Sequence, residues 1–332
     1  MKRLVRLNTH IGFISHAAVG GFEEKRGRLG ARFDFLDPTD KFNQKSFELA
    51  EGEMGRIALN TALAKLNLSH EDLSILVAGD LQNQCVGSSG GLSSFGAPFI
   101  GVYGACSTCT ESLIVLSSLL SSSETFKMGA AVTGSHNSVA ERQFRMPLEY
   151  GGVRSPSAQW TATAAGAFVL ARDKGEVAVK EFMPGKMIDG ATKDTMNMGA
   201  AMSFSAADTI ISYFRESEES PEKFDYIVTG DLGEVGSSIL TDILSERVPR
   251  AARRHIDCGT LLYNKRNQDC HSGASGCGCS ASVLSLEFLP LLEKGEIGDI
   301  LFLSTGALMN RTSTLQGQNI FGITPLIRIG KK

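Results

Sequence analysis

The sequence predicts an α/β protein made of two similar halves, in which strands alternate with helices and each sheet is mainly parallel and covered by helices. The main observation is a repeat of three segments in the same order. Strand ILVAGD (75–80) corresponds to YIVTGD (226–231), turn GACS (104–107) to GCGCS (276–280), and strand AVTG (131–134) to LSTG (303–306). This spacing is much longer than the ~20–50 residues of a solenoid repeat, so it indicates a duplicated domain half. Two such halves stacked together would give a body layered α/β/α/β/α.

In the first half, each expected element follows from a local pattern. Residues 5–19 are expected to form the first strand, and the charged, glycine-rich stretch 20–30 a loop. Residues 47–66 are expected to be helical, because apolar residues recur there at spacings of three to five. Short apolar runs predict buried strands at 73–78, 99–102, 130–134 and 161–170, the run 108–120 predicts a helix, and the polar stretch 141–159, with its prolines and glycines, predicts a loop.

The second half is expected to repeat this plan after the turn RDKG (172–175). We place the boundary between the halves there, which gives residues 1–173 and 174–330. Strands are expected at 177–182, 226–229 and 300–304, and helices at 204–214, 238–245 and 281–292. Residues 250–275 form a stretch that is longer than its counterpart in the first half.

The composition indicates an intracellular protein that does not bind nucleic acid. The chain has 332 residues, of which 42% are hydrophobic and 21% charged, and its formal net charge is −3. Lysines and arginines are scattered and form no basic stripe. The seven cysteines are irregularly spaced, which is typical of reduced thiols and not of a disulfide framework. We find no signal peptide and no apolar run of ~18 residues, so we expect no transmembrane segment.

Two sets of motifs carry a resemblance to known families. A duplicated α/β half with a GACS turn that leads into a buried helix resembles the thiolase and ketoacyl synthase superfamily, in which the cysteine of this turn, here Cys106, accepts the acyl group. More closely, and over nearly its whole length, the chain resembles the stage V sporulation protein AD (SpoVAD) family. The motifs are GRLG with FD (27–34), AGDLQNQ (78–84), GACST (104–108), TGSHN (133–137), TATAAGA (161–167), YIVTGDLG (226–233), SGCGCSA (275–281) and LSTGALM (303–309).

The resemblance implies a thiolase-like fold and a protein that binds dipicolinic acid, a small aromatic dicarboxylate of spores, without catalysing a reaction. It also implies integral membrane partners of the same spore operon and a peripheral location at the spore inner membrane. The implied role is to move dipicolinate, with calcium, in sporulation and germination. Superfamily members pair through the edge strand of the first half, which implies a homodimer. No cofactor and no metal site are expected.

The residues supply only part of the catalytic set that the superfamily uses. Cys106 follows a strand at the start of a helix, where the helix dipole can lower the pKa of a thiol. In the ketoacyl synthase pattern a histidine follows the strand at 225–229, but here that position is Gly230, and Asp231 comes next. Glycine has no side chain that could donate to an oxyanion, and a carboxylate would oppose the developing negative charge.

The other catalytic positions are also altered. The thiolase pattern HPLGASG aligns with CHSGASG (270–276), so its histidine falls on Cys270, with His271 one residue further on. The second thiolase cysteine aligns with Ser304, and serine is a poorer base than a thiolate at neutral pH. We therefore interpret the site as a retained pocket in which Cys106 and His271 are vestiges of a catalytic set.

A pocket for a flat dianion needs cationic or N–H donors around an apolar slot. The residues expected at the ligand are Cys106, His136, Gly230, Asp231, His271, Arg28 and Lys25, with Arg26, Arg142, Arg145 and Arg154 as further cationic candidates and Asp231 as a side chain that could face a calcium ion. Two alternatives stay open. One is an acyltransferase that uses Cys106 with His271, and the other is a structural adaptor that docks on a membrane complex and keeps only a vestigial pocket.

Overall fold

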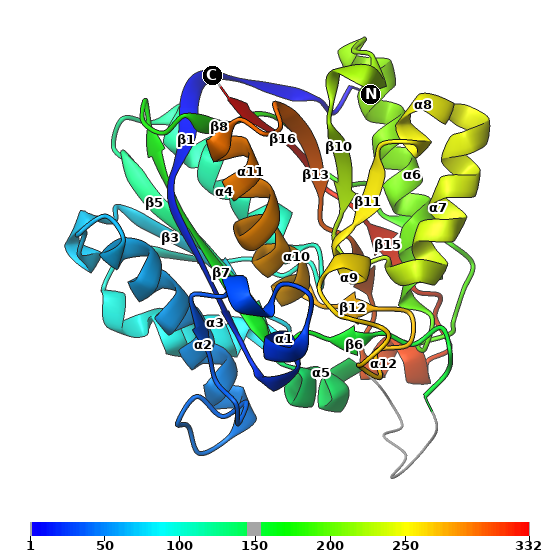
Figure 1. Cartoon of the computed structure of the whole chain (residues 1–332), viewed down its shortest axis with the longest axis horizontal. Helices are drawn as coiled ribbons and strands as arrows, with labels where there is room; N and C mark the ends of the chain where they lie inside the picture. The colour runs from blue at the N-terminus through cyan, green and yellow to red at the C-terminus, as the bar shows by residue number, and fades with distance from the viewer. Residues whose placement is uncertain (1, 145–153, 332) are drawn as a thin grey trace.

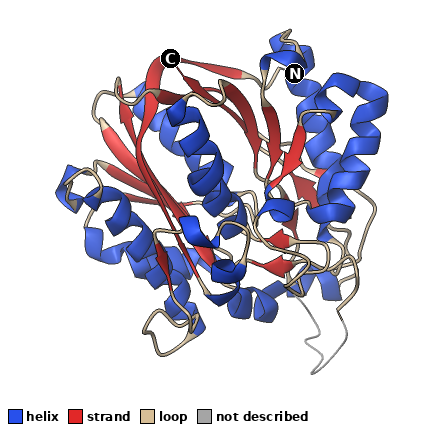
Figure 2. Ribbon diagram, in the orientation of Figure 1, coloured by secondary structure: helices blue, strands red, loops and turns tan. Residues whose placement is uncertain are grey.

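The computed structural model describes residues 2–144 and 154–331 and confirms the α/β fold (Figures 1 and 2). The main strands of the first half are β1 (Val5–Gly20), β3 (Ile75–Gly79), β4 (Phe99–Gly101), β5 (Met128–Ser135) and β7 (Ala164–Arg172), and those of the second half are β8 (Val177–Met183), β10 (Tyr226–Thr229), β11 (His255–Asp257), β13 (Asp299–Leu303) and β16 (Leu326–Lys331). They form one sheet in the order β11-β10-β13-β16-β8-β1-β7-β5-β3-β4, and β2 (Phe35–Leu36) pairs with β1 beside this path.

The two halves repeat one strand arrangement. In the first half β3 lies between its parallel neighbours β4 and β5, and the antiparallel strands β7 and β1 follow. In the second half β10 lies between the parallel strands β11 and β13, and the antiparallel strands β16 and β8 follow. An antiparallel pairing of β1 with β8 joins the halves. The boundary proposed between residues 173 and 174 falls in the turn that connects β7 to β8, and the division into two domains stays a prediction.

Three apolar clusters separate the elements into five layers. The main helices are α1 (Phe22–Arg26), α2 (Phe47–Ala64), α3 (Val86–Leu92), α4 (Thr108–Ser122), α5 (Asn137–Phe144), α6 (Met198–Ser217), α7 (Gly233–Arg247), α10 (Cys277–Val283) and α11 (Leu289–Lys294). One cluster packs α2 and α3 on the outer face of the first half, a central cluster holds α4, α10 and α11 between the inner faces of the sheet, and the third packs α6 and α7 on the outer face of the second half (Figure 1). Along β3, Leu76 belongs to the outer cluster whereas Ile75 and Val77 belong to the central one, because successive side chains of a strand point to opposite faces.

Smaller elements complete the fold. They are the strands β6 (Trp160–Thr161), β9 (Ile188–Asp189), β12 (Ala274–Ser275), β14 (Gly306–Leu308) and β15 (Phe321–Ile323), and the helices α8 (Pro249–Ala252), α9 (Cys258–Leu261) and α12 (Arg311–Leu315). Strands β6 and β12 pair with each other, and β14, β15 and β9 form a small three-stranded sheet. Within the described residues, no helix has both the length and the apolar character needed to cross a bilayer.

Most expected strands and helices are confirmed with shifted ends, but some expectations are wrong. The stretch 20–30 is not entirely a loop, because α1 forms there and the Glu24 carboxylate accepts from the backbone N–H of Gly21 at its start. The predicted loop 141–159 is helical as far as Phe144, and its residues 145–153 lie outside the described residues. The strand β16 and the helix α3 were not anticipated. The expectation of a mainly parallel sheet is wrong, because the central pairings from β13 through β16, β8, β1 and β7 to β5 are all antiparallel.

The predicted helix 281–292 is longer than expected and is interrupted. It begins with α10, widens into a π-turn at Leu284–Phe288 and continues as α11. Pro290 has no N–H to donate to the carbonyl of Leu286 four residues earlier. The guanidinium of Arg32 donates to that carbonyl at 3.3 Å and also pairs with Glu287, so a segment of the first half replaces the missing helical bond.

Candidate functional site

Cys106 lies in a sharp turn between β4 and α4. Gly104 and Cys106 form an isolated bridge, and Ala105 between them has φ of +53°, a left-handed conformation that is strained for alanine. The hydroxyl of Ser107 donates to the carbonyl of Gly104 at 2.6 Å and closes the turn. The turn places the thiol directly ahead of α4, which begins at Thr108, and leaves Cys106 only 5% exposed.

A small cavity lies over Cys106. Its volume is about 20 Å³, and its lining consists of Leu81, Ala105, Cys106, Ala140, Thr161, Met198, Ser275, Ala307 and Met309. The polar groups of this lining are the Cys106 thiol and the hydroxyls of Thr161 and Ser275, which lie 3.4 Å apart across the β6–β12 pair. Since a water molecule needs roughly 10–15 Å³ of such space, the cavity has room for about one water in this conformation.

Asp231 is the acidic group that the fold brings to Cys106. Its fully buried carboxyl accepts from the hydroxyl of Thr305 at 2.7 Å and from the backbone N–H of Gly276 at 2.8 Å, and the Cys106 thiol also hydrogen-bonds to it. Burial raises the pKa of Asp231 to about 7, and the hydrogen bonds from Thr305, Cys106 and Gly276 offset part of this rise. The thiol therefore faces a carboxyl group, and the cavity lining within the described residues contains no imidazole.

Gly230 occupies a position with no room for a side chain. A Cβ atom on Gly230 would lie 2.9 Å from the Cα of Ser304 and 3.0 Å from the backbone N of Thr305. Both neighbours are backbone atoms that follow β13, so they cannot rotate away as the end of a flexible side chain can. A histidine at residue 230 would require this part of the second half to move.

His271 is directed away from Cys106. Its Nδ1 lies 2.7 Å from the carbonyl oxygen of Ser155, and its Nε2 lies 2.8 Å from the carboxylate of Asp269. The residue does not line the Cys106 cavity, and its backbone has φ of +46° in a bridge with Gln159. The structure therefore does not bring His271 to the thiol.

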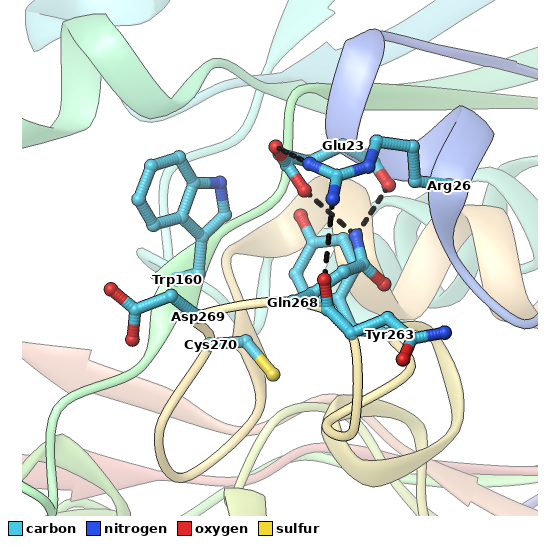
Figure 3. Close-up of a pocket in the computed structure, with 8 residues that line it drawn as sticks. Glu23, Arg26, Trp160, Tyr263, Gln268, Asp269 and Cys270 are labelled. Carbon is cyan, nitrogen blue, oxygen red and sulfur yellow. Dashed lines mark hydrogen bonds and ion pairs between the residues drawn. The ribbon is translucent and has the colours of Figure 1, made fainter.

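A second, larger cavity lies on the other side of the β6–β12 pair, next to Trp160 (Figure 3). Its volume is about 360 Å³, and its lining consists of Glu23, Arg26, Trp160, Tyr263, Asn267, Gln268, Asp269 and Cys270. Trp160 lines this cavity whereas the next residue, Thr161, lines the Cys106 cavity, so the strand pair forms a wall between the two. The charged groups at the larger cavity are paired: Arg26 with Glu23 at 2.9 Å, and Arg154, which stacks over Trp160, with Asp269 at 2.6 Å.

The remaining expected ligand residues lie away from the Cys106 cavity. His136 is fully buried, its Nε2 lies 2.8 Å from the carbonyl oxygen of Asp40, and its ring packs on Phe47 with the ring centroids 5.0 Å apart. Lys25 and Arg28 are exposed and line neither of these two cavities. Arg145 lies outside the described residues, and the side chain of Arg142 is not described either.

Asp80, the counterpart of Asp231 in the repeat, has a structural role. Its carboxylate accepts from the backbone N–H of Gln82 at 2.7 Å and from that of Ser88 at 2.6 Å, so it holds the start of α3. In the second half the matching task falls to Asp257, which accepts from the backbone N–H groups of Leu232 and Gly233 at the start of α7. Asp231 is thereby left to face the first half. Among the described residues, no group of three or more His, Cys, Asp or Glu side chains could hold a metal ion.

The sequence did not identify several residues of the cavity. Thr161 and Ser275 are part of motifs that we quoted for the resemblance, but nothing in their spacing indicates that β6 and β12 pair over Cys106. Met198 and Met309 carry no recognisable signal, because methionine at such positions is typical of an ordinary core. All four residues reach the cavity through contacts between segments that are far apart in the sequence, which local patterns do not reveal.

The fold and the site define a thiolase-like protein with a cysteine in the nucleophile turn and a carboxyl group opposite it. Solved structures confirm the fold. A variant of OleA from Xanthomonas campestris superposes with a TM-score of 0.63, at 14% identity over 98% of this chain and 100% of that one. Cerulenin-bound OleA gives a TM-score of 0.62, at 15% identity over 97% of each chain. At this level of identity the likeness concerns the fold alone.

The chain belongs to the stage V sporulation protein AD (SpoVAD) family, whose model matches residues 1–330. It is 39% identical over 312 residues to stage V sporulation protein AD of Bacillus subtilis (strain 168), which covers 94% of this chain and 92% of that protein. The family resemblance inferred from the sequence motifs is therefore confirmed, and the protein is a sporulation protein with a thiolase-like fold.

Proposed function

We propose that this protein binds dipicolinic acid without catalysing a reaction, and that it works in the spore inner-membrane complex that moves dipicolinate, with calcium, in sporulation and germination. Membership of the SpoVAD family carries the biological part of the proposal. The surroundings of Cys106 carry the chemical part, because Gly230 replaces the histidine of the catalytic pattern and the group in contact with the thiol is the carboxyl of Asp231. The expected partners are integral membrane proteins of the same operon.

The surroundings of Cys106 support a site without catalysis. Acyl transfer needs an oxyanion stabilised by donors and a base that moves protons. The described lining of the Cys106 cavity holds no imidazole, the crowding at Gly230 leaves no space for one, and His271 is engaged with Ser155 and Asp269. A thiol alone could accept an acyl group, but these neighbours would not help to transfer it.

The same surroundings favour a small planar acid as the ligand. Most of the described lining is apolar, and its neutral polar groups are the hydroxyls of Thr161 and Ser275, which lie 3.4 Å apart, and the thiol of Cys106. The N-terminus of α4, a helix of 15 residues, begins beside the thiol and contributes a partial positive charge that favours an anion. Small-molecule sites in proteins are usually apolar pockets with a few polar groups that orient the ligand.

The exposed edge of the sheet supports a homodimer. Strand β4 ends the strand order, all three of its residues are exposed, and its free edge offers unpaired backbone groups. Phe99 and Ile100 on this strand, with Tyr103 just after it and Val86 on α3, are among the exposed large apolar side chains. An edge of this kind is suited to pairing with a second copy of the chain.

Isothermal titration of the purified protein with dipicolinate, with and without calcium, tests the proposal. Isophthalate is the control ligand, because it has the same two carboxylates and lacks the ring nitrogen. We expect saturable heat with dipicolinate and none with isophthalate. We also expect Thr161→Val to bind dipicolinate about tenfold or more weakly, since a hydrogen bond to a charged group contributes about 1.5–3 kcal/mol. Thr312→Val, at an exposed threonine of α12, is the matched control.

Each alternative has its own outcome. No heat under any condition would reject the binding function and favour a structural adaptor. Incubation with acyl-CoA, followed by mass spectrometry of the peptide that contains Cys106, tests the acyltransferase. We expect no acyl adduct that turns over, and a product released in proportion to enzyme would overturn the proposal.

A further inference from the structure

The Cys106 cavity is too small in this conformation for a molecule larger than water. Its volume of about 20 Å³ is far below the roughly 300–1,000 Å³ of ligand pockets in proteins. A ligand can therefore reach the thiol only after some part of the lining moves. The lining itself indicates which part can move.

Met198 connects the cavity lining to the protein surface, because its side chain both lines the cavity and is part-exposed. Of the nine lining residues that the structure describes, eight are buried and Met198 is part-exposed. Met309, which follows β14, is 6% exposed and belongs to the same lining. The described lining thus contains two methionines, Met198 and Met309, that come from segments far apart in the sequence.

The backbone around Met198 is held in place, so its side chain is the movable part. Asn197 caps α6 by accepting from the backbone N–H of Ala200 at 3.3 Å. Gly199 packs against α7 so closely that a Cβ there would collide with the carbonyl of Leu232. The first turn of α6 is therefore fixed, whereas the methionine side chain has three rotatable bonds and adopts new rotamers at little cost.

We propose that Met198 and Met309 form a side-chain gate over Cys106, and that they rotate aside to admit a flat aromatic acid whose ring then packs against their thioether groups. Sulfur contacts with an aromatic ring contribute about 0.3–1.5 kcal/mol each, so the displaced methionines regain contact with the ligand. The identity of the ligand rests on the proposed function, whereas the existence of the gate does not. In this gate the two methionines admit flat ligands and exclude thicker ones.

The gate is tested by the rate at which thiol reagents modify Cys106, followed by peptide mass spectrometry. Iodoacetamide is the small reagent and N-phenylmaleimide the bulky, flat one. We expect slow modification in the wild-type protein and a rate about tenfold or more higher in Met198→Ala and Met309→Ala, because a permanently open route removes the opening step. Met187→Ala removes a methionine that is 64% exposed and is the matched control.

The other thiols report whether a variant opens selectively. Cys258 and Cys279 are fully buried and line neither cavity, so they react only when the fold opens more widely. Acceleration at Cys106 alone supports the gate. Equal acceleration at Cys258, or rates at Cys106 within twofold of wild type in both alanine variants, would overturn it.

A second arm separates the gate from the proposed function. Dipicolinate is expected to protect Cys106 from N-phenylmaleimide in the wild-type protein, and isophthalate is not. Selective acceleration in the alanine variants without protection by dipicolinate would keep the gate and reject the ligand. Saturable heat with dipicolinate and unchanged modification rates in the variants would keep the ligand and reject the gate.

Discussion

Replacing Glu24 with glutamine is expected to change how the stability of the protein depends on pH. Glu24 is 1% exposed, and its carboxyl accepts from the backbone N–H of Gly21 at 3.1 Å, from that of Thr163 at 3.0 Å and from the hydroxyl of Tyr263. These bonds fasten α1 to the start of β7 and to the segment after α9. Burial raises the pKa of Glu24 from 4.5 to about 7, and the hydrogen bond from Tyr263 offsets part of the rise.

The sign and size of the effect follow from the two pKa values. The folded protein holds the Glu24 proton more tightly than the unfolded chain, so this stabilisation is complete below pH 4.5 and is lost as the pH rises through about 7. At about 1.4 kcal/mol for each pH unit, the loss amounts to about 3 kcal/mol. Glu24→Gln does not titrate, so the free energy of unfolding of the wild type should fall by that amount relative to the variant.

Urea unfolding of both proteins between pH 4.5 and pH 8 measures this difference. The buried acids Asp231 and Asp257 are present in both proteins, so their titration cancels. Tyr263→Phe should steepen the loss in the wild-type background, because it removes a hydrogen bond that lowers the pKa of Glu24. A difference that stays constant with pH would refute the reasoning, and one of opposite sign would mean that the three donors outweigh burial.

The remaining predictions concern an ion pair, the crowded glycine and the sheet edge. Arg328→Leu should lower the free energy of unfolding by about 3–5 kcal/mol, because Glu181 and Asp299 would lose a cation whose side chain is 9% exposed; a loss under about 1 kcal/mol in urea unfolding would contradict this. Gly230→His should restore no acyl transfer in an assay of product release from acyl-CoA and should destabilise the protein by several kcal/mol, through strain in the backbone that a Cβ would meet. If the chain forms the homodimer proposed above, Ile100→Lys should convert it to monomer in light scattering, with stability changed by about 0.5 kcal/mol or less, and an unchanged dimer would place the interface elsewhere.

The duplicated fold was predictable because its strands are buried and apolar. Residues 226–229 were predicted as a strand, and β10 has the same bounds. A short apolar run bounded by turn residues is typical of a buried strand. Helix α3 was missed, because its sequence VGSSGGL has low helix propensity. It forms since Gly52 and Gly91 let α2 and α3 approach closely, with a Cβ on Gly52 lying 2.6 Å from the carbonyl of Gly87.

The sequence named both Cys106 and Asp231 as candidate site residues, but it did not predict the contact between them. Cys106 was located from a turn motif that is local in sequence, and the turn has the expected form. The contact between Cys106 and Asp231 depends on how the two halves meet, and no spacing within either half encodes it. His271 illustrates the same limit, because a shift of one residue in a loop with positive φ turns its ring toward Ser155.

The geometry also makes Asp231 and Gly230 part of the packing of the second half. The N–H of Gly276 and the hydroxyl of Thr305 bind the Asp231 carboxyl across the centre of the second half, so this residue is now part of the framework that positions the loop ahead of α10. Replacing it to restore a base would leave those two donors without a partner, at a cost of about 1–3 kcal/mol each. Since Gly230 is also packed against backbone, a side chain at residue 230 or a replacement of Asp231 would disrupt contacts that hold the second half together.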